Sequence, residues 1–510
     1  MVQLSASALA SLPPSVHVPT YDTARVRAGI VHFGVGGFHR AHQAMYLDRL
    51  LERGDTEWGI CGVGVLPFDS AMRDALSAQD NLYTLVTKSP DGESRAQIVG
   101  SIVEYLFAPD DPGVVLAKLI DPATKIVSLT ITEGGYSVDD ATGAFDPRDE
   151  DTLADLAAPT GAEPRSVLGF LVAALRERRA AGTVPFTVMS CDNIQGNGHV
   201  ARRAVLGFAE HQDVAFAAWI ADNVAFPSSM VDRITPAMTD ETRTDIAAEF
   251  GVEDLWPVRS ESFEQWVLED SFTAGRPALE DVGVQIVADV EPYELMKLRL
   301  LNASHQAMGY LGILAGVEFV HDVCTDPLFV EFLLGYMHEE AIPTLRPVPG
   351  IVLDEYCQPL ISRFSSDAIR DTLARQVVDG SDRIAKFLVP VVRDRLSAGQ
   401  SIDRCVLVIA AWSVFLEGRT ESGEPTPMVD RRVEELRAHV RLELEHPGSL
   451  LDYAPVFGEL GKDTRLREQF ISARTALKNQ GVRAVLSSLS RGQRVPKPPT
   501  PPATLRTTTR

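Results

Sequence analysis

A glycine turn between an apolar run and a helical pattern constrains the fold of this chain more than any other feature. Residues 28–33, AGIVHF, are short and apolar like a buried strand, and they lead directly into GVGGFHRAHQAMYLDRLL. Gly34 allows a tight turn, and Gly36 lets the backbone approach a pyrophosphate at the N-terminus of the following helix. His39 stands where the usual fingerprint has a third glycine. The pattern predicts an α/β, Rossmann-like dinucleotide-binding domain.

An acidic residue follows the second apolar run, WGICGVGVL at 58–66. In a dinucleotide domain such a residue accepts hydrogen bonds from ribose hydroxyls and repels a 2′-phosphate, so Asp69 favours NAD over NADP. Asp69 lies further from Gly34 than the usual spacing of ~20 residues. It could equally cap a helix over SAMRDAL, and both interpretations stay open.

Two polar residues come at the ends of later strand patterns. Residues 125–136, KIVSLTITEGGY, predict a buried strand that ends near Glu133, and the run that begins PFTVMSC ends in Asp192 and Asn193. Ligands of open α/β sheets bind at the carboxyl ends of the strands. Glu133 and Asn193 are therefore candidate site residues, although a loop carboxylate and a turn asparagine are the plainer alternatives.

The remaining patterns divide the chain near residue 290. Paired strands are expected over 83–90 and 96–106, a helix near 113–120, and a short extended segment over 230–236, MVDRITP. From residue 294 onward the patterns are helical, at 294–316, 326–341, 366–377, 380–398, 402–417, 428–445 and 464–487. We expect an NAD-binding α/β domain over 1–290, a mostly α-helical domain over 291–490, and a disordered Pro/Thr-rich tail over 491–510.

The first helical pattern of the second half, ELMKLRLLNASHQAMGYLG, holds three different polar groups among apolar residues. At ~100° per residue, His305 lies roughly 80° and Asn302 roughly 140° around the helix from Lys297, so the three share one broad face. Burial disfavours the charged form of a lysine, which lowers its pKa and suits it to act as a base. The alternative is that Lys297 extends to water and the other two are hydrogen-bonded core residues.

Composition excludes several classes of protein. A formal net charge of −22 over 510 residues argues against nucleic acid as the main partner. The five cysteines form no CxxC pair, and neither a signal peptide nor a membrane span is present, so we expect a cytoplasmic protein. His32, His39 and His42 lack a carboxylate or thiolate partner, which argues against a metal site.

Six motifs together resemble the polyol-specific long-chain dehydrogenase/reductase family. They are GVGGFHRAHQ (34–43), TITEGGY (130–136), SCDN (190–193), MVDRITP (230–236), KLRLLNASH (297–305) and DGSDRIAKF (379–387). The resemblance spans roughly residues 20–490. It implies two domains, NAD as cofactor, no metal, a monomer, and reversible oxidation of a polyol to a ketose, with D-mannitol and D-fructose as the expected pair.

The resemblance also implies roles for individual residues. Lys297 is the expected general base, Asn193 and Asn302 stabilise the substrate oxygen, His305 orients the substrate, and Glu294 lies on a proton route to water. Asp232, Arg375 and Arg383 are the expected polyol-binding residues, with Arg383 standing where the family more commonly has Lys. The expected cofactor-binding residues are Gly34, Val35, Gly36, Gly37, Phe38, His39, Arg40, Asp69 and Glu133.

Alternative functions stay open at this stage. A fructuronate or tagaturonate reductase shares most of these motifs, and Arg375 or Arg383 could hold the carboxylate of a sugar acid. A D-arabinitol dehydrogenase is equally similar. An NAD-binding sensor without turnover is the alternative outside enzymes, but a sensor has no need of a base.

Overall fold

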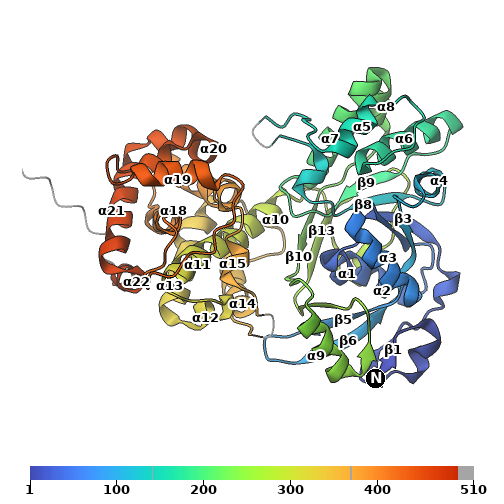
Figure 1. Ribbon diagram of the computed structural model, residues 1–510, viewed down its shortest axis with the longest axis horizontal. Coiled ribbons are helices and arrows are strands. Elements are labelled where there is room, and N and C mark those ends of the chain that lie inside the picture. Colours follow the sequence, from blue (N-terminus) through green and yellow to red (C-terminus); the bar gives the residue numbers. More distant parts are fainter. Residues whose placement is uncertain (140–141, 368–369, 492–510) are drawn as a thin grey trace, which may run out of the picture. The chain divides into compact units, whose positions relative to one another are not determined.

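The chain forms two compact units, which divide between Glu294 and Leu295, close to the boundary expected near residue 290. The computed structural model describes residues 1–139, 142–367 and 370–491 (Figure 1). Apart from Arg491, the tail expected to be disordered lies outside the described residues.

A five-stranded parallel sheet forms the centre of the first unit (Figure 1). Its spatial order is β7 (Ile102–Phe107), β4 (Gly59–Gly64), β3 (Ala28–Phe33), β8 (Ile126–Leu129) and β9 (Thr187–Ser190). The chain builds outward from β3 through β4 to β7, and then continues on the other side with β8 and β9. This arrangement is the Rossmann order, whose ligand site lies at the switch point between β3 and β8.

Side chains from alternate positions of the strands enter two different cores, which is why these strands read as continuous apolar runs. Val31 and Phe33 face one core, together with apolar side chains of α4 (Pro112–Ile120), α6 (Val167–Ala181) and α7 (Asn197–Gln212). Ile30 faces the other, together with side chains of α2 (Gln43–Glu52) and α3 (Ser70–Ala78). Helices therefore cover both faces of the sheet.

Smaller sheets complete the first unit. The antiparallel pair β5 and β6 confirms the paired strands expected over 83–90 and the start of 96–106, but β7 leaves that pair and joins the central sheet. The smaller sheets comprise β12 (Val258–Glu261), β5 (Tyr83–Lys88), β6 (Ser94–Val99) and β2 (Val16–His17); β10 (Ser229–Asp232), β13 (Gln265–Glu269) and β14 (Gln285–Val287); and β1 (Val2–Gln3) with β11 (Val252–Glu253). The other helices are α1 (Gly37–Ala41), α5 (Glu150–Ala157), α8 (Val214–Asn223), α9 (Asp240–Phe250) and α10 (Glu291–Met296).

The second unit is helical, and α18 (Asp403–Phe415) lies at its centre in contact with α11 and α21. Because α18 is apolar on all sides, it can only be stable when other helices surround it. The α-helices of this unit are α11 (Ala303–Leu314), α12 (Val320–Thr325), α13 (Pro327–Gly335), α14 (Leu353–Phe364), α15 (Leu373–Gln376), α16 (Gly380–Arg383), α17 (Val389–Ser397), α18, α19 (Val433–Leu442), α20 (Ala454–Phe457), α21 (Thr464–Gln480) and α22 (Val482–Ser490).

Three of the expected helices are interrupted by π-helical turns. These are η6 (Lys297–Asn302), η7 (Tyr336–Ala341) and η9 (Ile384–Leu388), and η6 contacts both of the others. The hydrogen bonds of a π-helix join residues five apart, so the turn is wider than an α-helical one. The apolar pattern alone does not reveal such a turn, because the side chains remain buried through it.

Two expected elements were wrong in extent. The strand expected over 125–136 ends at Leu129, because Thr132 turns the chain into a 3₁₀ segment, η4 (Glu133–Tyr136). Among the described residues of the range 366–377, the helix is α15 (Leu373–Gln376), whereas α14 (Leu353–Phe364) was not expected. Pro359 lies inside α14 and weakens its helical signal in the sequence.

Replacing Gly34 by alanine should destabilise the first unit by more than an ordinary left-handed glycine does. A Cβ at Gly34 would collide with the carbonyl oxygen of Thr130, while Gly54 has a similar φ (+98° against +92°) and no atom within 4 Å. We expect Gly54→Ala to lower the free energy of unfolding by about 1–2 kcal/mol and Gly34→Ala by more. If both variants lost the same free energy of unfolding in urea or thermal unfolding, the backbone of β3 and β8 could move apart without a loss of stability.

Candidate functional site

The glycine turn after β3 has the geometry that a bound pyrophosphate requires. Gly34 adopts a left-handed backbone (φ +92°) beside the main chain of Thr130, and the Thr130 hydroxyl donates to the Gly34 carbonyl at 2.7 Å. Gly36 is exposed, and a Cβ built there would meet no atom closer than 3.9 Å. The open space beside Gly36 therefore fits the close approach of a phosphate group to the backbone.

Two stacked histidine rings lie beneath this turn. The His32 and His39 rings are parallel within 8° at 3.5 Å. His32 Nδ1 is 2.8 Å from the Ser128 hydroxyl, and its Nε2 is 3.0 Å from the Thr130 hydroxyl. Burial lowers the pKa of His32 to about 3 and that of His39 well below its ordinary value, so both rings are neutral. They support the turn as packed, uncharged groups.

The helix that follows the turn is short, which differs from the single helix expected there. It ends at Ala41 because His42 leaves helical geometry and its Nε2 lies 2.9 Å from the Gln265 carbonyl oxygen; α2 begins directly afterwards. The Arg40 side chain is 1% exposed, donates to the Trp256 carbonyl, and lies over the Tyr83 ring. Among the expected cofactor residues, Val35 is buried, whereas Gly37 and Phe38 are half-buried.

Asp69 lies beyond the carboxyl end of β4, as the last residue of the 3₁₀ segment η3 (Pro67–Asp69), which leads directly into α3. Its Oδ2 accepts hydrogen bonds from the backbone N–H groups of Val65 and Leu66, both at 2.9 Å. Asp69 is the N-cap residue of α3, as the alternative expected, but its side chain makes no cap hydrogen bond to that helix. The carboxylate holds its own loop closed.

Four further expected residues belong to the first unit. Glu133 and Asn193 are exposed and lie just beyond the ends of β8 and β9, whereas Asp232 is buried at the end of β10. The buried Glu294 carboxylate accepts from the Gly196 N–H, at 3.1 Å to each oxygen, at the N-terminus of α7. The positive end of a long helix favours a carboxylate at this place.

The second unit carries Lys297 and Asn302 on the π-helical turn η6, and both side chains are buried, at 7% exposed. The backbone N–H of Ala303 donates to the Leu298 carbonyl, five residues earlier. Residues five apart therefore lie about one turn apart, which brings Lys297 and Asn302 closer in direction than the ~140° expected for an α-helix. The angles predicted at ~100° per residue were therefore wrong for this segment.

His305 lies one turn further along, on α11. The charge of Asp371 raises the pKa of its ring, and the charges of Arg375, Arg383 and Arg363 lower it, each by less than burial does. Burial lowers the pKa of His305 to about 3, so the ring is neutral at physiological pH. Its Nε2 is buried and has no hydrogen-bond partner among the described residues, an uncommon and unfavourable state for a polar atom.

Arg375 and Arg383 are held by neighbouring groups. Arg375 makes a two-pronged ion pair with Asp371, at 2.7 Å for each of the two contacts, and Arg383 donates to the Gln376 carbonyl at 2.8 Å. Sequence reasoning missed Asp371, which lies before α15 and pairs with Arg375 outside a regular helix. It also gave Asp192 no role beyond marking the end of a strand.

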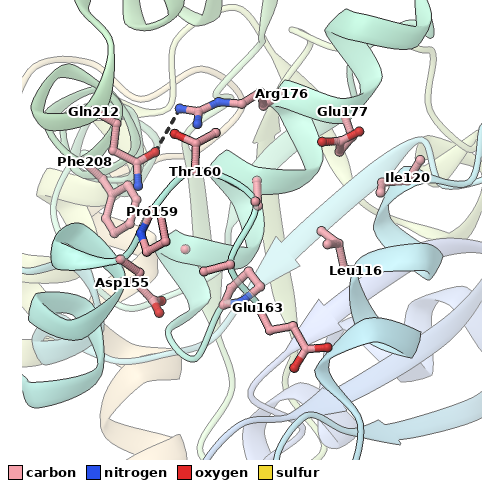
Figure 2. A pocket seen from close by; sticks show the side chains of 16 residues that line it. Leu116, Ile120, Asp155, Pro159, Thr160, Glu163, Arg176, Glu177, Phe208 and Gln212 are labelled. Carbon is pink, nitrogen blue, oxygen red and sulfur yellow. Dashed lines mark hydrogen bonds between the residues drawn. The ribbon is translucent and has the colours of Figure 1, made fainter.

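The described residues also contain a cavity of about 200 Å³ outside these groups, between α4, α6 and α7 (Figure 2). Three of its polar side chains are hydrogen-bonded: Arg176 donates to Gln212, and the Asp155 carboxylate accepts from the N–H groups of Arg165 and Ser166.

The described residues lack two features that would change the interpretation of the chain: a metal-binding group and a membrane-spanning helix. No group of three or more His, Cys, Asp and Glu side chains in the described part of the chain could hold a metal ion. Likewise, no helix within those residues is long and apolar enough to cross a membrane.

Two family models match most of the chain. The mannitol dehydrogenase Rossmann domain matches residues 28–281, and the mannitol dehydrogenase C-terminal domain matches residues 289–478. The chain belongs to the mannitol dehydrogenase family. This membership confirms the family resemblance and the fold class, a Rossmann-type domain followed by a helical C-terminal domain.

Individual members of the mannitol dehydrogenase family are similar over nearly their whole length. The mannitol 2-dehydrogenase of Phaeosphaeria nodorum is 47% identical, with 93% of this chain and 83% of the relative covered. The structure of Pseudomonas fluorescens mannitol 2-dehydrogenase in ternary complex with NAD and D-mannitol has a TM-score of 0.88 at 44% identity, covering 96% and 99% of the two chains. A D-sorbitol dehydrogenase in substrate-free form has a TM-score of 0.86 at 40% identity, covering 94% and 99%.

Acidification should destabilise the protein through His32. Its folded-state pKa of about 3 lies below the ordinary value of 6.5, so the unfolded chain binds the proton first and stability falls as the pH drops below about 6.5. Between pH 6.5 and 5 we expect a loss of up to about 2 kcal/mol that His32→Gln does not show. Thermal unfolding midpoints measured across this range test the difference, and parallel curves for the two proteins would contradict it.

Proposed function

We propose that this protein is an NAD-dependent mannitol 2-dehydrogenase that oxidises D-mannitol reversibly to D-fructose. One observation carries the proposal: a lysine amine and an asparagine amide, five residues apart, are buried together on a π-helical turn. A secondary alcohol releases hydride only as its oxygen loses a proton. That oxygen requires a base and hydrogen-bond donors, which Lys297 and Asn302 can supply.

NAD, held at the glycine turn after β3, supplies the acceptor for the hydride. The chain's own residues then control the proton. We propose that Lys297 takes the proton of the substrate hydroxyl, and that the amides of Asn193 and Asn302 donate to the oxygen as negative charge develops on it. Burial of an amine favours its neutral form, which is the form a base requires.

Glu294 is the proposed route by which the proton leaves. Its carboxylate is fixed by the Gly196 N–H and lies three residues before Lys297 in the sequence. A carboxylate held in this way can accept a proton and pass it to water without a change in its own position. Glu294 is therefore a relay group in this proposal and does not contact the substrate.

The remaining residues are proposed to recognise the polyol. A neutral His305 with an unpartnered Nε2 can accept or donate one hydrogen bond to a hydroxyl. Asp232 can accept from other hydroxyls, and Arg383 can donate to them. We propose that NAD contacts Glu133, Asp69 and the turn residues 34–40. The lone pairs of the Asp69 carboxylate that its own loop does not use would accept hydrogen bonds from the ribose hydroxyls.

A polyol is favoured over a sugar acid because Arg375 is engaged. Its guanidinium is already paired on both prongs with Asp371, so it has less capacity for a substrate carboxylate. D-sorbitol is the second candidate substrate, since it differs from D-mannitol only at C2 and a D-sorbitol dehydrogenase is 40% identical to this chain. We further propose that the protein acts as a monomer in the cytoplasm, where its five buried thiols stay reduced.

A substrate panel tests the proposed reaction. With NAD⁺ and each of D-mannitol, D-sorbitol, D-arabinitol, D-mannonate and D-altronate, we expect kcat/KM to be highest for D-mannitol, measured as NADH absorbance. Turnover confined to the two sugar acids would contradict the proposed substrate, but it would not contradict the assignment of Lys297 as the base. Binding of NAD without turnover of any of the five would favour a sensor.

Replacing Lys297 by alanine should lower kcat and kcat/KM for the best substrate together, by about 10³-fold, because the base acts in the transition state. Lys297→Arg should be equally impaired, since a guanidinium stays protonated. Lys118→Ala, which removes a lysine paired with Glu104 in the first unit, is the control expected to keep normal kinetics. Near-normal activity of Lys297→Ala would exclude it as the base.

A further inference from the structure

The Asp192 carboxylate ties together the ends of two neighbouring strands of the central sheet. It is 8% exposed and accepts hydrogen bonds from the backbone N–H groups of Ile131 (3.0 Å) and Thr132 (2.9 Å), just beyond β8. The Tyr136 hydroxyl also donates to it at 2.6 Å, and lies 2.7 Å from the Ser190 hydroxyl at the end of β9. Asp192 itself directly precedes Asn193.

Thr132 has a backbone conformation that only glycine adopts readily. Its φ of +63° and ψ of 170° are unfavourable for any residue with a Cβ, and more so for a β-branched one. Thr132 is also exposed, so side-chain packing does not hold it in place. Its N–H bond to Asp192 is therefore a principal restraint on the strained turn that leads into Glu133.

The main chain of Asp192 is fixed as firmly as its side chain. The Asn197 amide, fully buried, donates to the Asp192 carbonyl at 2.9 Å and to the Ser229 carbonyl at 2.7 Å, and accepts from the Ser229 N–H at 2.9 Å. Ser229 begins β10, the strand that ends in Asp232. Asp192 is thus joined to the segments that carry Glu133, Asn193 and Asp232.

Burial raises the pKa of Asp192 from its ordinary value, and its hydrogen bonds with Tyr136, Thr132 and Ile131 oppose that shift. A buried carboxylate that accepts three hydrogen bonds is costly to replace by a group with fewer acceptor sites. The arrangement therefore favours one fixed position of the Ile131–Thr132 turn.

We propose that Asp192 is a positioning residue for polyol oxidation: by holding Thr132 in its strained conformation, it sets the place of the turn at the end of β8 relative to Asn193. This inference rests on the proposed function. We call the hydrogen bond between the Asp192 carboxylate and the Thr132 N–H the clamp. Small displacements of groups that orient the reactants can cost about 100-fold in rate, so loss of the clamp should lower kcat.

The test is a double-mutant cycle between Asp192 and Thr132. Asp192→Asn keeps the shape but replaces one acceptor oxygen by an NH₂ group that faces a backbone N–H. We expect kcat with D-mannitol to fall about 100-fold. Adding Thr132→Gly should restore at least tenfold of this loss, because glycine adopts the conformation without the clamp, whereas adding Thr132→Ala should not.

Asp155→Asn is the matched control. Asp155 is 7% exposed and, like Asp192, accepts from two backbone N–H groups and one hydroxyl, but it lines the cavity between the outer helices (Figure 2). We expect Asp155→Asn to lower the thermal midpoint as Asp192→Asn does, with kcat unchanged. A loss of kcat in both variants would indicate general damage and overturn the positioning role, as would a normal kcat in Asp192→Asn.

Amide hydrogen exchange of the segment 126–136 separates this proposal from the proposed function. In the unmodified protein the Ile131 and Thr132 amides should be protected, and in Asp192→Asn they should exchange faster, whichever substrate is used. Unchanged exchange would refute the clamp. Faster exchange in a protein that oxidises none of the five substrates would refute the proposed function alone.

Discussion

The close approach of β3 and β8 at their carboxyl ends is the constraint on which the first unit depends. Gly34 has no side chain to keep the strands apart, and the Thr130 hydroxyl and the His32 ring complete the contact with hydrogen bonds. The strand order reverses at this point, so the glycine turn and the Thr132 turn emerge side by side from adjacent strands. One contact thus fixes both the backbone of the glycine turn and the backbone that Asp192 holds.

Two uncharged rings and a hydrogen-bonded carboxylate and amide make this contact stable in a buried setting. The stacked pair of His32 and His39 would repel if both rings were charged, and burial removes that charge. The Asp192 carboxylate accepts from the N–H groups of Ile131 and Thr132, and the Asn197 amide donates to the carbonyls of Asp192 and Ser229. Polar networks inside a protein specify one arrangement only when their members are paired, which is why a strained residue such as Thr132 can persist at this edge of the sheet.

Features that depend on local pattern could be predicted from the sequence, and features that depend on loop geometry could not. The glycine turn, the parallel strands and the helical second half all follow from periodicity and glycine placement. That Asp69 bonds to its own loop at Val65 and Leu66 has no periodic signal. The same is true of the left-handed Thr132, since a threonine at this position does not indicate positive φ. The pairing of Arg375 with Asp371 likewise lacks a helical signal, because Asp371 lies before α15 begins.

The spacing of Lys297, Asn302 and His305 acquires a physical meaning from the π-helical turn. The interval of five residues from Lys297 to Asn302 matches one turn of a π-helix, and the interval of three from Asn302 to His305 matches the α-helix that begins at Ala303. Each interval therefore suits the type of helix that spans it. If the segment were α-helical throughout, Asn302 and His305 would both be rotated relative to Lys297 by part of a turn. The wide turn and the polar residues form a single feature, because the residues can share a direction only where the helix is widened.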